Sequence, residues 1–103
     1  MVLRITRQEA SRERATLRLE GRLVAEWAGL LERECSAFHR SGRAVRLDLT
    51  RVGFVDRAGI EALARLSRQG AEILCGPGAV ANVLEGEDIP VTRDRESADD
   101  GRL

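Results

Sequence analysis

The sequence contains no lysine, so all 17 of its basic residues are arginine, and 17 acidic residues balance them. With a formal net charge of zero, the chain lacks the basic surplus of proteins that bind nucleic acid. The use of arginine alone fits a GC-rich coding sequence, although arginine also brings planar, multi-donor contacts wherever it meets an acidic surface. We therefore expect no nucleic-acid partner.

Long apolar runs are missing as well. A membrane-spanning helix needs about 20 consecutive apolar residues, and no segment of this chain approaches that length. The first residues, Met-Val-Leu-Arg, lack the basic start and long apolar run of a signal peptide. These absences predict a cytoplasmic protein with no direct membrane insertion.

Cysteine and histidine are scarce, being represented by Cys35, Cys75 and His39. The two cysteines are far apart and lie within apolar patterns, which favours reduced core thiols over a disulfide. Two cysteines and a distant histidine make a poor metal site, so we expect neither a metal nor a cofactor. His39 has no nucleophile or carboxylate at a spacing that suggests a catalytic triad.

The composition is that of one packed domain. The chain has 103 residues, of which 43% are hydrophobic and 33% charged, as in ordinary globular proteins. A chain of this length can bury roughly two thirds of the surface that its unfolded form exposes. We predict a single domain over residues 1–91, followed by a flexible polar tail over residues 92–103.

Alternating apolar and polar residues predict strands around residues 3–6, 16–20 and 45–50, each with one solvated face. A fourth strand is expected at 71–75, and a weaker pattern suggests a fifth at 89–91. Residues 8–14 are charged, which predicts an exposed loop between the first two strands.

Apolar residues at spacings of three and four predict helices over residues 25–40 and 57–69, and a shorter helix over 79–84. Asp56 is positioned as the N-cap of the second helix, while Gly42 and Gly70 are suited to end the first and second. The order of elements predicts a hairpin followed by βαβ units. The expected fold is therefore α/β, with a mixed four- to five-stranded sheet and all helices on one face.

The segment over residues 45–63, VRLDLTRVGFVDRAGIEAL, closely resembles the signature of the sulfate transporter and anti-sigma factor antagonist family, called STAS. In that family an apolar strand ends in Asp and continues through a short loop to an Asp-Ser-x-Gly turn that enters a helix. Residues 21–24 and 70–76 resemble the neighbouring strand segments of the family. The resemblance covers about residues 15–86 and implies a STAS-like fold.

The resemblance also implies a non-enzymatic regulator in which a kinase phosphorylates the serine at the start of the second helix, and the phosphate controls binding to a partner. Here Arg57 occupies the serine position, with Asp56 before it and Gly59 two residues after it. Val24 replaces an acidic residue that many antagonists carry near this turn. We therefore predict that position 57 is not a phosphorylation site and that the chain has lost kinase-dependent switching.

The candidate partner-binding residues surround this turn: Val55, Asp56, Arg57, Ala58, Gly59, Glu61 and Ala62. A cation in the first turn of a helix is disfavoured by roughly 0.3 to 1 kcal/mol unless a negative group offsets it. For Arg57 that group is expected to be Glu61, a bound anion or a carboxylate of the partner.

Three functions stay open at this level. The first is a protein-binding regulator that resembles an anti-sigma factor antagonist. The second is a structural STAS subunit of a larger assembly, such as a lipid-transport ATPase or a stressosome-like scaffold. The third is a sensor of small anions or nucleotides, with Arg57 as the clamp. The expected partners are proteins: an anti-sigma factor or kinase-like protein, an assembly subunit, or a second copy of the chain.

Overall fold

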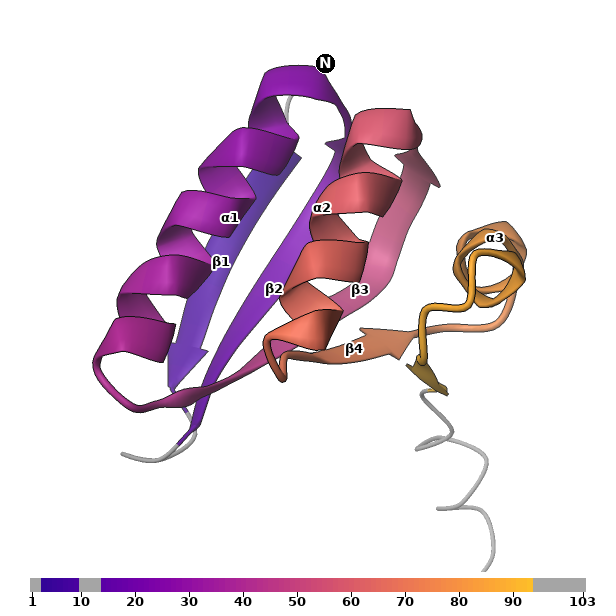
Figure 1. Ribbon diagram of the computed structural model, residues 1–103. Helices are drawn as coiled ribbons and strands as arrows, with labels where there is room; N and C mark the ends of the chain where they lie inside the picture. The colour runs from indigo at the N-terminus through magenta and orange to yellow at the C-terminus, as the bar shows by residue number, and fades with distance from the viewer. Residues whose placement is uncertain (1–2, 10–13, 94–103) are drawn as a thin grey trace, which may run out of the picture.

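The computed structural model describes residues 3–9 and 14–93 (Figure 1). Its elements, in chain order, are β1 (Leu3–Glu9), β2 (Arg14–Leu23), α1 (Ala25–Arg40), β3 (Ala44–Val55), α2 (Arg57–Arg68), β4 (Glu72–Cys75), α3 (Ala79–Gly86) and β5 (Thr92–Arg93).

The strands form one sheet in the order β1-β2-β3-β4-β5. β1 is antiparallel to β2, and every later pair is parallel. Figure 1 shows α1 and α2 side by side over the sheet, with α3 beyond α2 near the β4 end of the sheet. This confirms the predicted mixed α/β sheet, in which each helix connects two neighbouring parallel strands.

The core lies between the sheet and the helices. Alternate residues of β2 (Ala15, Leu17 and Leu19) are buried, whereas the residues between them are only partly covered. The helices contribute buried side chains to the same cluster, among them Leu31, Leu63, Leu66 and Leu84. Burying one leucine side chain stabilises a fold by roughly 1.5 to 3 kcal/mol, so this single core is the main source of stability.

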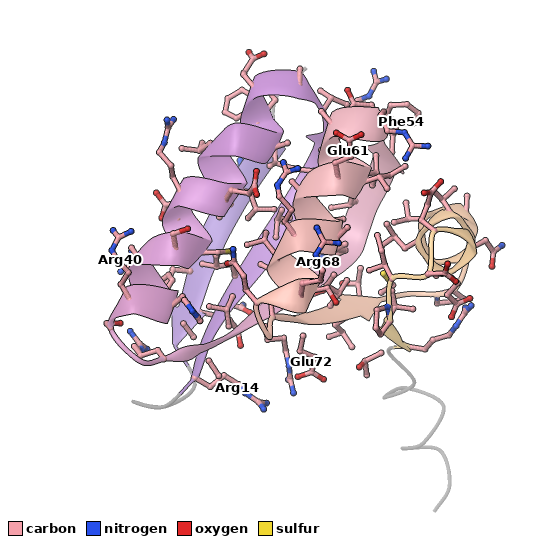
Figure 2. All side chains as sticks on the ribbon, in the orientation of Figure 1. Arg14, Arg40, Phe54, Glu61, Arg68 and Glu72 are labelled. Carbon is pink, nitrogen blue, oxygen red and sulfur yellow. The ribbon has the colours of Figure 1, made fainter. Side chains whose placement is uncertain are left out.

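The other face of the sheet is polar. Arg46 Nε lies 3.1 Å from Glu72 Oε1, and Arg14 Nη1 lies 3.9 Å from the same oxygen. Figure 2 shows Arg14 and Glu72 close together at the end of the sheet opposite the start of α2. The one-sided pattern of the strands therefore reflects one covered face and one charged face.

Both cysteines are free and buried, as predicted. Burial is the main cause that raises the pKa of Cys35 to about 12 and that of Cys75 to about 11. They pack as small apolar residues. Within the described ranges, no helix has the length and apolar character needed to cross a membrane.

The sheet has the predicted fifth strand, but this strand lies at residues 92–93 and not at 89–91. Ile89 is a buried core residue whose amide donates to Leu84 O at 3.0 Å, and Pro90 has no amide proton to give to a strand ladder. β5 begins at Thr92, which pairs with Leu74. Residues 92 and 93 therefore belong to the sheet and not to the predicted tail. The rest of that tail, residues 94–103, lies outside the described residues.

Two other boundaries differ from the predictions. Gln8 lies in β1 and Arg14 begins β2, so the predicted 8–14 loop is shorter; residues 10–13 are outside the described part. β3 continues to Val55 because its last residues pair with the end of β2 after a shift in register. As a result β2 and β3 end together, and α1 and α2 both begin at that edge.

Candidate functional site

Asp56 connects the beginnings of two helices. Its Oδ1 accepts a hydrogen bond from the Gly59 amide at 2.9 Å, which confirms it as the N-cap of α2. Its Oδ2 accepts a second bond, at 3.1 Å, from the amide of Ala25, the first residue of α1. Ala25 has a φ of 44°, a left-handed conformation that costs a non-glycine residue about 1 to 2 kcal/mol. The carboxylate of Asp56 therefore stabilises a strained junction as well as a helix end.

Gly59 allows α2 to approach the end of β2. A Cβ at this position would lie 2.5 Å from Leu23 O and 2.7 Å from Val55 Cγ1, closer than carbon atoms can pack. The amide of Asp56 donates to the same Leu23 carbonyl at 3.2 Å. These contacts hold the turn between β3 and α2 against the end of β2.

Arg57 projects from this turn with 63% of its side chain exposed. Its Nη1 and Nη2 donate to Glu87 Oε1 and Oε2 at 3.3 and 3.2 Å, forming a two-pronged pair. The hydrogen bonds to Glu87 are the main cause that raises the pKa of Arg57, while Glu61 makes only a smaller electrostatic contribution. The sequence analysis predicted a negative group beside Arg57 and named Glu61, a bound anion or a partner carboxylate. In the structure the main negative group is instead Glu87, which lies just after α3 and 30 residues along the chain.

The seven candidate contact residues do not share one surface. Arg57 and Glu61 are exposed, whereas Val55, Asp56 and Ala58 are partly buried. Gly59 and Ala62 are buried, and Ala62 has no exposed surface. At these two positions a contact with a partner could only be indirect, because both residues lie beneath the surface.

A second arginine fixes the other side of α2. Arg65 donates through Nε and Nη2 to the two oxygens of Glu32 on α1, at 2.8 and 2.9 Å. This hydrogen bonding is the main cause that lowers the pKa of Glu32. α2 is thus held to α1 through Arg65 and to the end of α3 through Arg57.

An apolar hollow lies beside the turn, between the end of β3 and α3. It is lined by Gly53, Phe54, Val55, Ala79, Val80 and Val83. Phe54 and Val83 are 45% and 44% exposed. The guanidinium carbon of Arg22 lies 4.9 Å from the centre of the Phe54 ring. Figure 2 shows Phe54 beside the beginning of α2, with Arg68 toward the other end of that helix.

Of the residues that line this hollow, only Val55 was among the candidate residues taken from the sequence. The signal that could have found it is the spacing of Val80 and Val83, which puts both on one face of a short helix, together with an aromatic residue in the signature segment. Among the described residues, no group of three or more His, Cys, Asp or Glu side chains could hold a metal ion.

A family model described as "Mlab, STAS domain" matches residues 6–75, which run from β1 to the end of β4. This range contains the Asp56 cap, Arg57 and the close approach at Gly59. A comparison with curated proteins found no match.

Solved structures of anti-sigma factor antagonists share the fold. Unphosphorylated SpoIIAA superposes with a TM-score of 0.68 at 15% identity, covering 94% of this chain and 96% of SpoIIAA. An antagonist from Mycobacterium paratuberculosis has a TM-score of 0.74 at 18% identity, covering 95% and 90%. A putative antagonist from Thermotoga maritima has a TM-score of 0.62 at 16% identity, covering 92% and 90%. The topology is common to all of them, although few residues are.

Proposed function

The chain belongs to the STAS domain family, and from that premise we propose that it is a non-enzymatic regulator that binds a protein partner in the bacterial cytoplasm. It resembles an anti-sigma factor antagonist in this proposal but has no phosphorylation switch at the start of α2. The surface that we propose for the partner consists of the exposed parts of the turn over residues 55–58, together with Glu61.

The observation that carries this proposal is the position and exposure of Arg57. It is the first residue of α2, directly after the Asp56 cap, and 63% of its side chain is exposed. A guanidinium has no hydroxyl to phosphorylate, so the site would behave as permanently unphosphorylated. The turn itself is held by Asp56 and Gly59, and these supports favour a rigid presentation of Arg57 to a partner.

Partner capture from the native host tests this proposal. Immobilised wild-type protein is compared with Arg57→Glu, which reverses the charge at the turn, and with Arg68→Glu, which makes the same change at the other exposed end of α2. We expect the Arg57 variant to lose a partner that the wild type and the Arg68 variant retain. An identical set of captured proteins for all three would contradict the proposal.

A second candidate is a structural subunit of a larger assembly. It is favoured by the matched family model, whose description names Mlab and not an antagonist. Size-exclusion chromatography with light scattering separates the two candidates. A stable complex of high mass that survives Arg57→Glu supports the structural subunit, whereas a small complex that depends on Arg57 supports the regulator.

The anion sensor is a third candidate, in which a small anion competes with Glu87 for both terminal nitrogens of Arg57. A bound anion would have to displace this carboxylate. A rise in melting temperature with nucleotides or phosphate would support the sensor.

A further inference from the structure

We infer that the partner docks through an acidic and apolar segment, which binds the hollow beside α2 between two arginine side chains. The inference rests on the proposed function and adds the chemistry of the partner. We call this region the arginine-bordered hollow; it consists of Phe54, Val55, Ala79, Val80 and Val83, with Arg22 and Arg57 at its margins.

The floor of the hollow is apolar and open. Phe54 and Val83 are the large hydrophobic side chains that stand out as exposed in the described part of the chain. Val80, Val83 and Glu87 follow one another at spacings of three and four, so one stripe of α3 leads from the hollow to the Glu87 carboxylate. An apolar patch with a polar rim is typical of a surface that binds another protein.

The rim carries an excess of positive charge. The guanidinium of Arg22 lies over the Phe54 ring. Among the described residues, no carboxylate forms a salt bridge with Arg22. Arg57 has a carboxylate partner, but that partner comes from the protein itself. A segment that carries carboxylates on each side of an apolar side chain complements this distribution.

In the free protein, Glu87 occupies the position beside Arg57 that a carboxylate of the partner would take. Its two oxygens accept from both terminal nitrogens of Arg57, the fork geometry that arginine forms with any carboxylate. The two side chains are 63% and 38% exposed, so a carboxylate arriving from solvent reaches the same nitrogens. Glu87 therefore acts as an internal competitor that weakens the binding of acidic segments.

Two short peptides of equal size test the inference. Acetyl-Glu-Leu-Glu-amide carries the proposed chemistry, and acetyl-Gln-Leu-Gln-amide is its neutral match. In titrations of the ¹⁵N-labelled protein followed by NMR, we expect the acidic peptide to bind more tightly and to shift the amides of Phe54, Val80 and Val83. Removing the competing charge with Glu87→Gln raises the affinity for the acidic peptide by about two- to fivefold, the range of exposed ion pairs.

Charge-removing variants locate the effect. Arg22→Gln and Arg57→Gln lower the affinity for the acidic peptide, whereas Arg68→Gln, on the far end of α2, leaves it unchanged. Equal affinity for the two peptides, shifts away from the hollow, or no response to Glu87→Gln would overturn the inference.

The outcome is separable from that of the proposed function. If Arg57→Glu abolishes partner capture while the peptides bind equally, the regulator remains and the acidic chemistry of its partner is rejected. If the peptides behave as expected while partner capture ignores Arg57, the hollow binds acidic segments but the proposed function fails.

Discussion

The guanidinium of Arg57 faces the carboxylate of Glu87 with two hydrogen bonds, joining the first residue of α2 to the residue that follows α3. The pair therefore links the turn after β3 to the end of α3. Both side chains are exposed to solvent, so water competes for their hydrogen bonds and salt screens their attraction.

The first prediction is that this pair contributes little to folding. Glu87→Gln should keep the urea midpoint close to that of the wild type, because exposed ion pairs stabilise proteins weakly. Equilibrium unfolding followed by circular dichroism measures the effect. A large fall in the midpoint would show that the pair stabilises the fold. Changes in binding by Arg57 and Glu87 variants could then arise from partial unfolding.

The second prediction concerns the double role of Asp56. Asp56→Ala removes both the cap of α2 and the bond to the Ala25 amide, so we expect it to cost at least the typical ~1 kcal/mol of one N-cap, and up to about 2 kcal/mol. Asp56→Asn keeps one of the two side-chain oxygens, so its free energy of unfolding should lie between those of the wild type and the alanine variant. Urea denaturation measures all three. Equal stabilities for the asparagine variant and the wild type would mean that the Ala25 bond contributes nothing.

The third prediction compares two glycines. Gly59→Ala would place a Cβ against the Leu23 carbonyl and Val55, so we expect a loss of about 1 to 3 kcal/mol or more from overpacking. Gly29, inside α1, has no atom within 4 Å of the equivalent position. Gly29→Ala should therefore stabilise the protein by roughly 0.5 to 1 kcal/mol, because alanine loses less backbone entropy in a helix. Thermal unfolding of both variants tests the opposite signs.

The fourth prediction uses the absence of lysine and tyrosine, which leaves the thiols as the main side chains that titrate near pH 9 to 11. The pKa of Cys35 rises from 9.0 to about 12 on folding, and that of Cys75 to about 11. The unfolded chain therefore loses these protons first. The contribution of the two protonated thiols to the free energy of unfolding is fully present below pH 9. It falls as the pH rises, with a limiting slope of about 1.4 kcal/mol per pH unit for each thiol.

Urea unfolding at pH 8.5 and pH 10.5 measures this fall. Cys35→Ala lowers the stability at both values by leaving a cavity, but it should flatten the dependence on pH. An unchanged slope in this variant would show that another group is responsible.

The fifth prediction concerns the pair that joins α1 and α2. Arg65 lowers the pKa of Glu32, so the stabilisation is present above the unfolded value of about 4.5 and is lost as the pH falls through the folded pKa. In Arg65→Gln the pKa of Glu32 should rise, because burial remains while the hydrogen bonds and positive charge are removed. Carboxyl ¹³C NMR titration of Glu32 checks this. A titration curve that does not move would mean that the pair does not persist in solution.

Much of the fold followed from local patterns. The period of two in the strands and the spacings of three and four in the helices located every predicted helix and four of the strands. The Asp56 cap was also predictable, since its hydrogen bond to Gly59 spans only three residues. The fifth strand was misplaced because the apolar pattern at Ile89 reflects core burial and not pairing in the sheet.

The sequence by itself determined which residues could form helices and strands, where α2 begins, and that its first residue carries a guanidinium. Local hydrogen bonds and hydrophobic periodicity carry that information. The tertiary structure decided which groups those residues meet. Asp56 reaches Ala25 across 31 positions and Arg57 reaches Glu87 across 30, because successive crossovers bring the ends of distant elements together. Such partners depend on the packing of whole elements, so no spacing within the sequence identifies them.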